Sequence, residues 1–343
     1  MTDGRAAVPR GGHRALRVLA SSAGATWRVV VCPHAGGAAS YYRRLVLAAR
    51  RPPVALPGPR GARAPFAGAP EVVAVQYPGR ETRFAEPPVQ TMTDLVADVA
   101  GPVRALLADD VPTVLLGHSL GASVAVRVAA GLGPTEAPDL LVVSGRSARA
   151  DHTGPAGRVE DGRSAVGPGR GTARDDAALR SWVAALGGTP PELLADAELF
   201  ALHARVLRAD LAVHDSLAAG DGPAPAITAP LLLLAGSDDV ASPPESVLPW
   251  SERARAGVRH RVVEGGHFFV GDRAPEVLDA LRAALTAVVT GSSARDTRDT
   301  RDASDTLGRG ARGPAAEGRW VRSREVVAAD LRRLEETRAG GPS

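Results

Sequence analysis

A serine, two aspartates and a histidine follow one another along the chain in an order that could activate a nucleophile. Ser119 stands in the pentapeptide Gly-His-Ser-Leu-Gly at 117–121, between an apolar run, 111–116, and a run of small residues with helical composition, 122–132. Glycines on both sides of a serine suit a sharp, strained turn, because side chains there would crowd the neighbouring strand and helix. Because the chain is rich in glycine and serine, this pattern could occur by chance. The surrounding sequence must therefore show whether Ser119 is a nucleophile.

The residues that could activate this serine come later in the chain. A serine hydroxyl at its ordinary pKa is a poor nucleophile, so it needs a general base, and the base needs a carboxylate that stabilises its charge. Asp238 and Asp239 follow the apolar run 231–234, and His267 follows another apolar run. Serine, aspartate, histidine is the order expected behind such a turn. Each acid alone could be a loop or helix-cap residue. We predict a catalytic triad of Ser119, Asp239 and His267, with Asp238 as the alternative acid.

Acyl transfer also requires N–H donors for the oxyanion of the transition state, each worth about 3 kcal/mol. The backbone N–H of Leu120, directly after the serine, should be one donor. The second should come from Pro-His-Ala-Gly-Gly at 33–37, where glycines let the backbone turn its amides inward, and we assign it to Ala35. His34 is a rival base, but it precedes the serine, so we expect a supporting hydrogen bond or loop packing from it. His118 should point away from the turn and be structural.

Strands and helices must position these residues. Helical patterns alternate with apolar runs that indicate buried strands, which predicts a mostly parallel sheet with helices on both faces. The strand, turn and helix around Ser119 predict an α/β-hydrolase fold. Pro102 should kink or split the second helix. The predicted strands are 27–32, 72–77, 111–116, 140–144, 230–235 and 259–263, and the predicted helices are 38–50, 92–108, 122–132, 243–256 and 274–289.

Two internal stretches break the alternation. Residues 51–70 hold repeated Pro, Gly, Ala and Arg without an apolar period, which predicts a flexible surface insertion. Residues from about 150 to 220 contain a helical region, 172–217, in which Thr189 and Glu192 flank two prolines as a capping-box start. We expect this second stretch to fold over the mouth of the site as a helical lid.

Length and composition favour one hydrolase-sized domain with tails. The chain has 343 residues, enough to bury a sizeable core. We place the α/β-hydrolase domain at 15–289, after an N-terminal tail at 1–14. Residues 290–343 begin with a charged, repetitive segment, and we expect a disordered or partly helical tail there.

Charge and hydropathy exclude several classes of partner. The formal net charge is +3, all the basic residues are arginine, and acidic residues are interleaved with them along most of the chain. Without a clustered basic face we expect no nucleic-acid partner. No apolar stretch reaches the roughly 20 residues that span a bilayer. We therefore expect no membrane partner, and a monomeric protein in the cytoplasm.

The single cysteine and the remaining histidines carry less information. Cys32 lies within an apolar run, which excludes an intramolecular disulfide and favours a buried structural thiol over a nucleophile. The histidines outside the motifs above, such as His152 and His214, should lie on the surface.

A set of motifs, matching in order and spacing, resembles the stand-alone type II thioesterases of polyketide and nonribosomal peptide pathways over roughly residues 15–288. The motifs are Pro-His-Ala-Gly-Gly (33–37), Ser-Tyr-Tyr-Arg (40–43), Val-Gln-Tyr-Pro-Gly-Arg-Glu (75–81), Gly-His-Ser-Leu-Gly (117–121), Ser-Gly-Arg (144–146), Leu-Gly-Gly-Thr-Pro-Pro (186–191), Leu-Arg-Ala-Asp (207–210) and Gly-Gly-His-Phe-Phe (265–269).

The resemblance implies an α/β-hydrolase with a small helical lid that removes stalled or wrong acyl groups from the phosphopantetheine arm of acyl or peptidyl carrier proteins. It implies Ser119, Asp239 and His267 as the triad and Ala35 and Leu120 as oxyanion donors. Hydrolysis by such a site needs no metal or redox cofactor.

The sequence departs from the family pattern in three places. The segment 51–70 is extra, the stretch after Arg146 is longer and more polar than expected, and Val240 follows the acid where a proline is usual.

Two alternative functions remain open. A small-molecule esterase or acyltransferase could use the same triad. A noncatalytic binding protein with a hydrolase fold is a third possibility, although such a protein would be expected to lose a triad member.

Overall fold

A seven-stranded sheet forms the centre of the part of the chain that the computed structural model describes, residues 13–21, 24–51, 66–133, 136–148, 175–219 and 224–290. The strand order is β1-β3-β2-β4-β5-β6-β7. All neighbouring pairs are parallel except β1 and β3. The strands are β1 (Leu16–Ala20), β2 (Arg28–Cys32), β3 (Glu71–Val75), β4 (Thr113–His118), β5 (Leu140–Ser144), β6 (Leu231–Gly236) and β7 (Val258–Val263).

Six of these strands lie within a residue or two of the predicted ranges, and β1 is an additional strand. The central strands are continuous runs of Val and Leu because both faces of a parallel sheet are buried. Strand β1 pairs antiparallel to β3 at the edge of the sheet, with Leu16 opposite Val75. Its residues are half-buried or exposed, so no apolar run marks the strand in the sequence.

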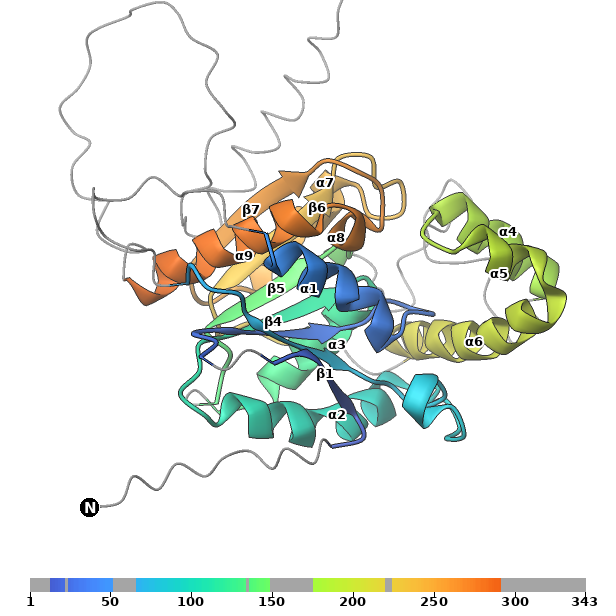
Figure 1. Ribbon diagram of the computed structural model, residues 1–343, viewed down its shortest axis with the longest axis horizontal. Coiled ribbons are helices and arrows are strands. Elements are labelled where there is room, and N and C mark those ends of the chain that lie inside the picture. The colour runs from blue at the N-terminus through green and yellow to red at the C-terminus, as the bar shows by residue number, and fades with distance from the viewer. Residues whose placement is uncertain are drawn as a thin grey trace, which may run out of the picture.

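Helices cover both faces of the sheet (Figure 1). On one face lie α2 (Met92–Leu107) and α3 (Leu120–Ala130); on the other lie α1 (Arg43–Ala49), α8 (Phe269–Asp272) and α9 (Ala274–Val289). Alternate residues of β4 divide between the two layers. Leu115 packs in the cluster that contains residues of α2 and α3, whereas Val114 and Leu116 pack in the cluster that contains residues of α1 and α9.

Four of the predicted helices differ from the structure in detail. Helix α2 runs through Pro102 without being split, and the Thr91 side chain caps its start by accepting from the Asp94 N–H. Helix α3 begins at Leu120, directly after the serine. The predicted helix 243–256 is instead a short helix, α7 (Pro244–Val247), followed by a 3-10 helix, η4 (Leu248–Arg253). The helix 38–50 likewise begins as a 3-10 helix, η1 (Ala39–Tyr42), before α1.

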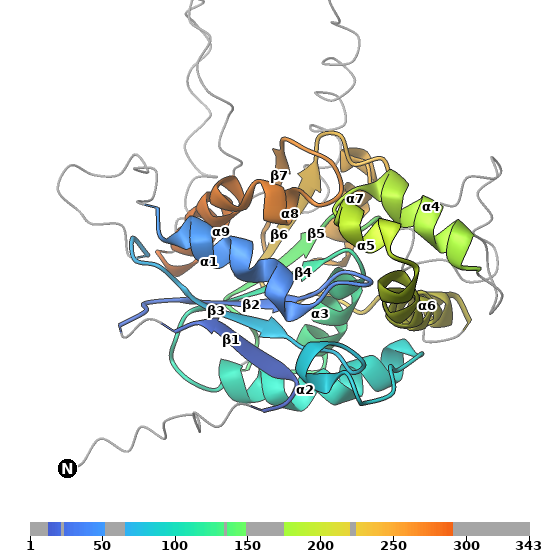
Figure 2. The ribbon, with the colours of Figure 1, turned by 45° about the vertical axis from the view of Figure 1, so that its right-hand side comes forward.

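Three helices between β5 and β6 form a separate layer beside the sheet, which we call the lid (Figure 2). They are α4 (Asp176–Leu186), α5 (Pro191–Ala195) and α6 (Ala197–Ala219). The lid has its own small core, which includes Leu179, Phe200 and Leu207. The predicted cap is wrong: Pro190 precedes α5 without a side-chain capping bond, so Thr189 does not cap the helix, although proline does stand in its first turn.

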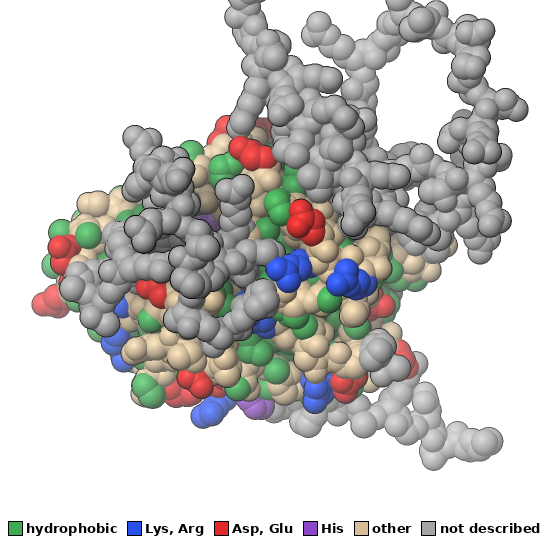
Figure 3. All heavy atoms as spheres, turned by 180° about the vertical axis from the view of Figure 1, so that it is seen from behind, with side chains coloured by type: hydrophobic (Ala, Val, Ile, Leu, Met, Phe, Trp, Pro, Cys, Tyr) green, Lys and Arg blue, Asp and Glu red, His purple; other side chains and the backbone are tan. Residues whose placement is uncertain are grey.

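Several predictions fall outside the described residues: the segments 1–12, 52–65 and 149–174, and the tail from residue 291. At the end of the predicted surface insertion, however, Phe66 is buried and its ring lies 6.3 Å from that of Trp27. The sequence prediction is wrong at that residue. Over the stretches of chain that are described, no helix is long and apolar enough to cross a bilayer. On the face drawn in Figure 3, acidic and basic side chains lie interspersed.

Candidate active site

The strained turn that the glycines predict lies between β4 and α3. Ser119 has φ 54° and ψ −120°, a backbone conformation that is uncommon for a residue with a side chain. A Cβ on Gly117 would lie 2.3 Å from the Gly121 carbonyl oxygen, and a Cβ on Gly121 would lie 2.0 Å from the Cys32 carbonyl oxygen. The turn therefore packs backbone directly against backbone, and it presents the Ser119 side chain at the end of the strand.

The structure brings Ser119, His267 and Asp239 together in hydrogen-bond contact. Ser119 Oγ lies 3.1 Å from His267 Nε2, and His267 Nδ1 lies 2.9 Å from Asp239 Oδ2. Because an ionised carboxylate only accepts hydrogen bonds, Nδ1 carries the ring proton and Nε2 has its lone pair directed at the serine hydroxyl. This is the tautomer in which a histidine can take a proton from serine.

The loop after β6 determines which of the two aspartates reaches the histidine. The Asp239 carboxylate is fully buried, and its second oxygen accepts the N–H groups of Ala241 and Ser242. Asp238 is exposed and accepts a hydrogen bond from the Ser237 hydroxyl. The structure thus places Asp239, and not Asp238, beside His267.

The predicted oxyanion donors lie in the two segments that meet behind Ser119. Leu120 is the first residue of α3, where N–H groups have no partner within the helix. Ala35 lies in a turn in which the Gly37 N–H donates to the His34 carbonyl oxygen at 2.9 Å. Within the described parts of the chain, neither Leu120 N–H nor Ala35 N–H donates a hydrogen bond.

Two further histidines lie within the site, and both have lowered pKa values. Burial, assisted by the nearby His267, lowers the pKa of His34 to about 3, and its Nδ1 lies 3.0 Å from the Tyr42 hydroxyl. Burial first and then His267 also lower the pKa of His118 well below its ordinary value. Its ring lies 5.2 Å from that of His267, and its Nδ1 lies 3.1 Å from Ser144 Oγ. Both rings are therefore neutral at neutral pH and pack beside His267 as weak bases.

Contrary to the sequence prediction that the remaining histidines lie on the surface, three of them, His203, His214 and His260, are half-buried. His214 is half-buried, and its Nδ1 lies 2.9 Å from an Arg146 guanidinium nitrogen. His203 is half-buried on α6, and a Cβ on Gly36 would lie 3.0 Å from its ring. His152 lies outside the described residues. No group of three or more His, Cys, Asp or Glu side chains in the described segments is arranged to hold a metal ion.

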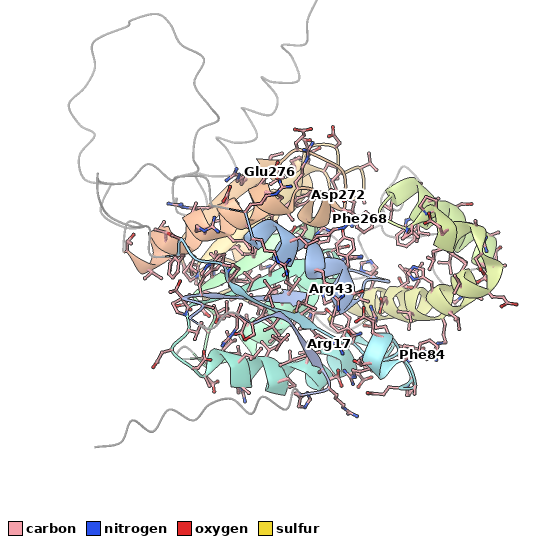
Figure 4. The ribbon with its side chains drawn as sticks, viewed as in Figure 1. Arg17, Arg43, Phe84, Phe268, Asp272 and Glu276 are labelled. Carbon is pink, nitrogen blue, oxygen red and sulfur yellow. The ribbon has the colours of Figure 1, made fainter. Side chains whose placement is uncertain are left out.

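The lid contacts the site through residues to which sequence reasoning assigned no role. Between α4 and α5, Gly188 lies against the ring of Phe268, close enough that a Cβ would be 2.4 Å from it. Phe268 follows His267 and lies on the side of the domain that faces the lid (Figure 4). Outside the site, Arg205 of α6 lies over the ring of the exposed Phe84 at 5.1 Å. Gly188 and Phe268 both stand in motifs of the sequence, but nothing in those motifs indicated that the two residues are in contact.

Comparisons with known proteins agree with this geometry. Residues 27–285 match the family described as Thioesterase domain. The chain is 32% identical over 262 residues to the probable cadicidin biosynthesis thioesterase of Streptomyces griseus, covering 75% of this chain and 62% of that protein. It is 31% identical over 252 residues to thioesterase PikA5 of Streptomyces venezuelae, covering 73% and 78%. The chain therefore spans less than two thirds of the length of the Streptomyces griseus protein.

The solved structures confirm the predicted fold class. The type II thioesterase YbtT, from the yersiniabactin NRPS/PKS biosynthetic pathway, superimposes with a TM-score of 0.63 at 27% identity, covering 80% of this chain and 99% of that chain. The mostly parallel sheet, the helices on both faces and the lid between β5 and β6 are those of an α/β-hydrolase.

Proposed function

Because this chain belongs to the thioesterase domain family, we propose that it is a serine thioesterase, with Ser119 as nucleophile, His267 as general base and Asp239 as the acid that orients the base. The observation that carries the proposal is the continuous hydrogen-bonded series from Ser119 Oγ through the His267 ring to the buried Asp239 carboxylate. We assign the oxyanion to the backbone N–H groups of Ala35 and Leu120.

In the first half of the reaction, His267 Nε2 accepts the Ser119 proton as Oγ attacks the thioester carbonyl carbon. The carbonyl oxygen becomes an oxyanion that accepts from the two N–H groups. The tetrahedral intermediate collapses when its C–S bond breaks, and the sulfur leaves as a thiol after taking the proton from Nε2. The acyl group remains on Ser119 as an ester.

In the second half, water replaces the thiol. His267 Nε2 accepts a proton from water as the water oxygen attacks the ester carbonyl, and the oxyanion forms again at the same donors. The C–O bond to Ser119 breaks, and Oγ recovers the proton from Nε2. A free carboxylic acid is released and the enzyme is restored. The weakly basic His34 has no role in these proton transfers, because a ring with a pKa of about 3 is too poor an acceptor near neutral pH.

We further propose that the substrates are acyl groups on the phosphopantetheine arm of acyl or peptidyl carrier proteins, and that hydrolysis removes stalled or wrong groups. The support is the family and the named pathways of its relatives: cadicidin biosynthesis for the Streptomyces griseus protein and the yersiniabactin pathway for YbtT. One chain supplies all three side chains and both amides of the site, so a monomer should suffice.

The test is hydrolysis of acyl-pantetheine and acyl-carrier thioesters, followed by mass spectrometry of the carrier. Ser119→Ala should lower kcat by at least about 10⁴-fold. Ser181→Ala, at an exposed position on α4, should retain wild-type rates. Equal rates for wild type and Ser119→Ala would refute the assignment. Faster turnover of matched oxygen esters would favour an esterase, and acyl transfer to an added amine or alcohol in preference to water would favour an acyltransferase.

A further inference from the structure

A buried ion pair links the lid to the loop that carries Ala35. Asp210, on α6, is 2% exposed, and Arg80, after β3, is 6% exposed. One guanidinium nitrogen of Arg80 donates to Asp210 Oδ1 at 2.5 Å. Asp210 Oδ2 accepts the Gly36 N–H at 2.6 Å, and the other terminal nitrogen of Arg80 donates to the Gly37 carbonyl oxygen at 2.6 Å. Carboxylate, guanidinium and loop backbone thus form a closed ring of hydrogen bonds.

The ring holds a turn that has an alternative conformation. The Gly37 N–H donates to the His34 carbonyl oxygen, and Gly36 has φ +73°, so residues 34–37 form a type II turn with Ala35 and Gly36 at its centre. Type I and type II turns differ by a rotation of the central peptide, which here joins Ala35 to Gly36. Asp210 accepts the N–H of this same peptide, and so selects the orientation seen in the structure.

Simple attachment of the lid would not require this arrangement. Elsewhere Val213 and Leu217 of α6 pack in the main core of the domain. The Ser216 hydroxyl also accepts the Met92 N–H, so α6 is attached to the domain without the ion pair. Two buried charges carry a desolvation penalty that only good geometry and further hydrogen bonds offset. Here those further bonds go to the backbone of Gly36 and Gly37, directly after the proposed oxyanion donor.

We propose that Asp210 and Arg80 are positioning residues that fix the orientation of the Ala35 loop, so that the oxyanion site forms only while α6 is docked. This inference rests on the proposed function and deepens it, because it couples lid position to transition-state stabilisation. When α6 moves away, Asp210 leaves Gly36, the central peptide is free to rotate, and the turn that carries the Ala35 N–H is no longer held in one conformation. Acyl groups would then bind or leave through an opened lid without being hydrolysed.

Asp210→Asn tests this proposal with little change in shape. The amide has one oxygen for the Gly36 N–H, but its NH₂ group then faces the Arg80 guanidinium, and two donors cannot pair. We expect kcat to fall by about 10- to 100-fold, the loss that misplaced reacting groups cause, with KM changed less than about threefold. The matched control is Asp176→Asn, which removes the half-exposed ion pair with Arg208 within the lid and should leave kcat and KM within about twofold.

Reaction with a fluorophosphonate separates this inference from the proposed function. The probe phosphonylates an activated serine and places an oxygen in the oxyanion site, whatever the natural substrate is. Asp210→Asn should slow labelling of Ser119 by a factor similar to its loss in kcat. If Ser119 of the wild type is labelled rapidly but the wild type hydrolyses no thioester, the proposed substrate is wrong. The positioning role is then tested by comparing the labelling rates of wild type and Asp210→Asn. A folded Asp210→Asn with wild-type kcat and labelling rate would overturn the positioning role.

A measurement on the wild-type chain covers the case in which Asp210→Asn does not fold. Amide hydrogen exchange is compared before and after phosphonylation of Ser119. If the loop and α6 are coupled, the adduct should slow exchange both in peptides that cover 33–37 and in peptides that cover 203–213, and leave the start of α4 unchanged. Slower exchange in the loop alone would overturn the coupling.

Discussion

The substitution Gly121→Ala tests whether close backbone contact builds the site. A Cβ at this position would lie 2.0 Å from the Cys32 carbonyl oxygen and 2.6 Å from the Pro33 carbonyl oxygen. Real Cβ contacts are essentially never shorter than 3.0 Å. The first residues of α3 and the end of β2 must therefore separate by about 1 Å, which is 3.0 minus 2.0 Å. Both clashing groups belong to the backbone, so no side-chain rotation relieves the contact.

This displacement sets the expected magnitudes. Overpacking of a well-packed interior costs about 1–3 kcal/mol, and a backbone clash belongs at the upper end, about 3 kcal/mol. For a domain of this size, about 3 kcal/mol lowers Tm by roughly 6–12 °C. The same movement carries Ser119 and Leu120 away from the loop that holds Ala35. A misplacement of about 1 Å at reacting groups costs about 10²-fold in rate, so kcat should fall by at least that factor.

Urea and thermal unfolding, together with steady-state thioester hydrolysis, measure both effects. The control is Gly131→Ala at the other end of α3, where the nearest atom to an added Cβ is the Val128 carbonyl oxygen at 3.6 Å and φ is −81°. That variant should unfold within about 1 kcal/mol of wild type, if anything more stably, and keep its kcat. A Gly121→Ala protein with wild-type Tm and kcat would refute the reasoning.

Two further predictions concern the acid and the thiol. Asp239→Asn should lower kcat by about 10⁴-fold, because the amide favours the wrong histidine tautomer. Asp238→Asn, in the exposed position, should keep kcat within about twofold of wild type. Steady-state kinetics on the two variants shows which aspartate is the acid of the triad. Burial raises the pKa of Cys32 to about 12, so the folded protein should resist iodoacetamide from pH 7 to 9 and react once urea unfolds it. Modification of Cys32 in the native protein at pH 8, detected by mass spectrometry, would contradict its buried position.

Most of the fold could be predicted from local sequence patterns. The buried strands are continuous runs of Val and Leu, so they can be recognised without knowing which other strands pair with them. The grouping of the candidate site residues could be predicted because the carboxyl ends of parallel strands meet at one edge of the sheet. Ser119 follows β4, Asp239 follows β6 and His267 follows β7, so chain order alone placed three distant residues together.

The features that the sequence did not reveal depend on partners far along the chain. Strand β1 has no apolar run because it lies half-exposed at an edge, and only its pairing with β3 makes it a strand. The pairing of Arg80 with Asp210 has no periodicity or turn signal, since a buried charge looks the same in sequence as an exposed one. Thr189 has the composition of a cap, but the chain enters α5 with Pro190 at the capping position instead.

The two proposed oxyanion donors are related by the same close contact that requires glycine at position 121. Gly121 lies against the carbonyl oxygens of Cys32 and Pro33, three and two residues before Ala35, and Leu120 lies directly before Gly121. The absence of a Cβ at this position allows the start of α3 to approach the end of β2 closely. The proposed oxyanion site requires this approach, because its two N–H groups come from these two segments. If the proposed donors are right, the second glycine of the pentapeptide sets the distance between them, and the Asp210 carboxylate, which accepts the Gly36 N–H, holds the turn that contains Ala35.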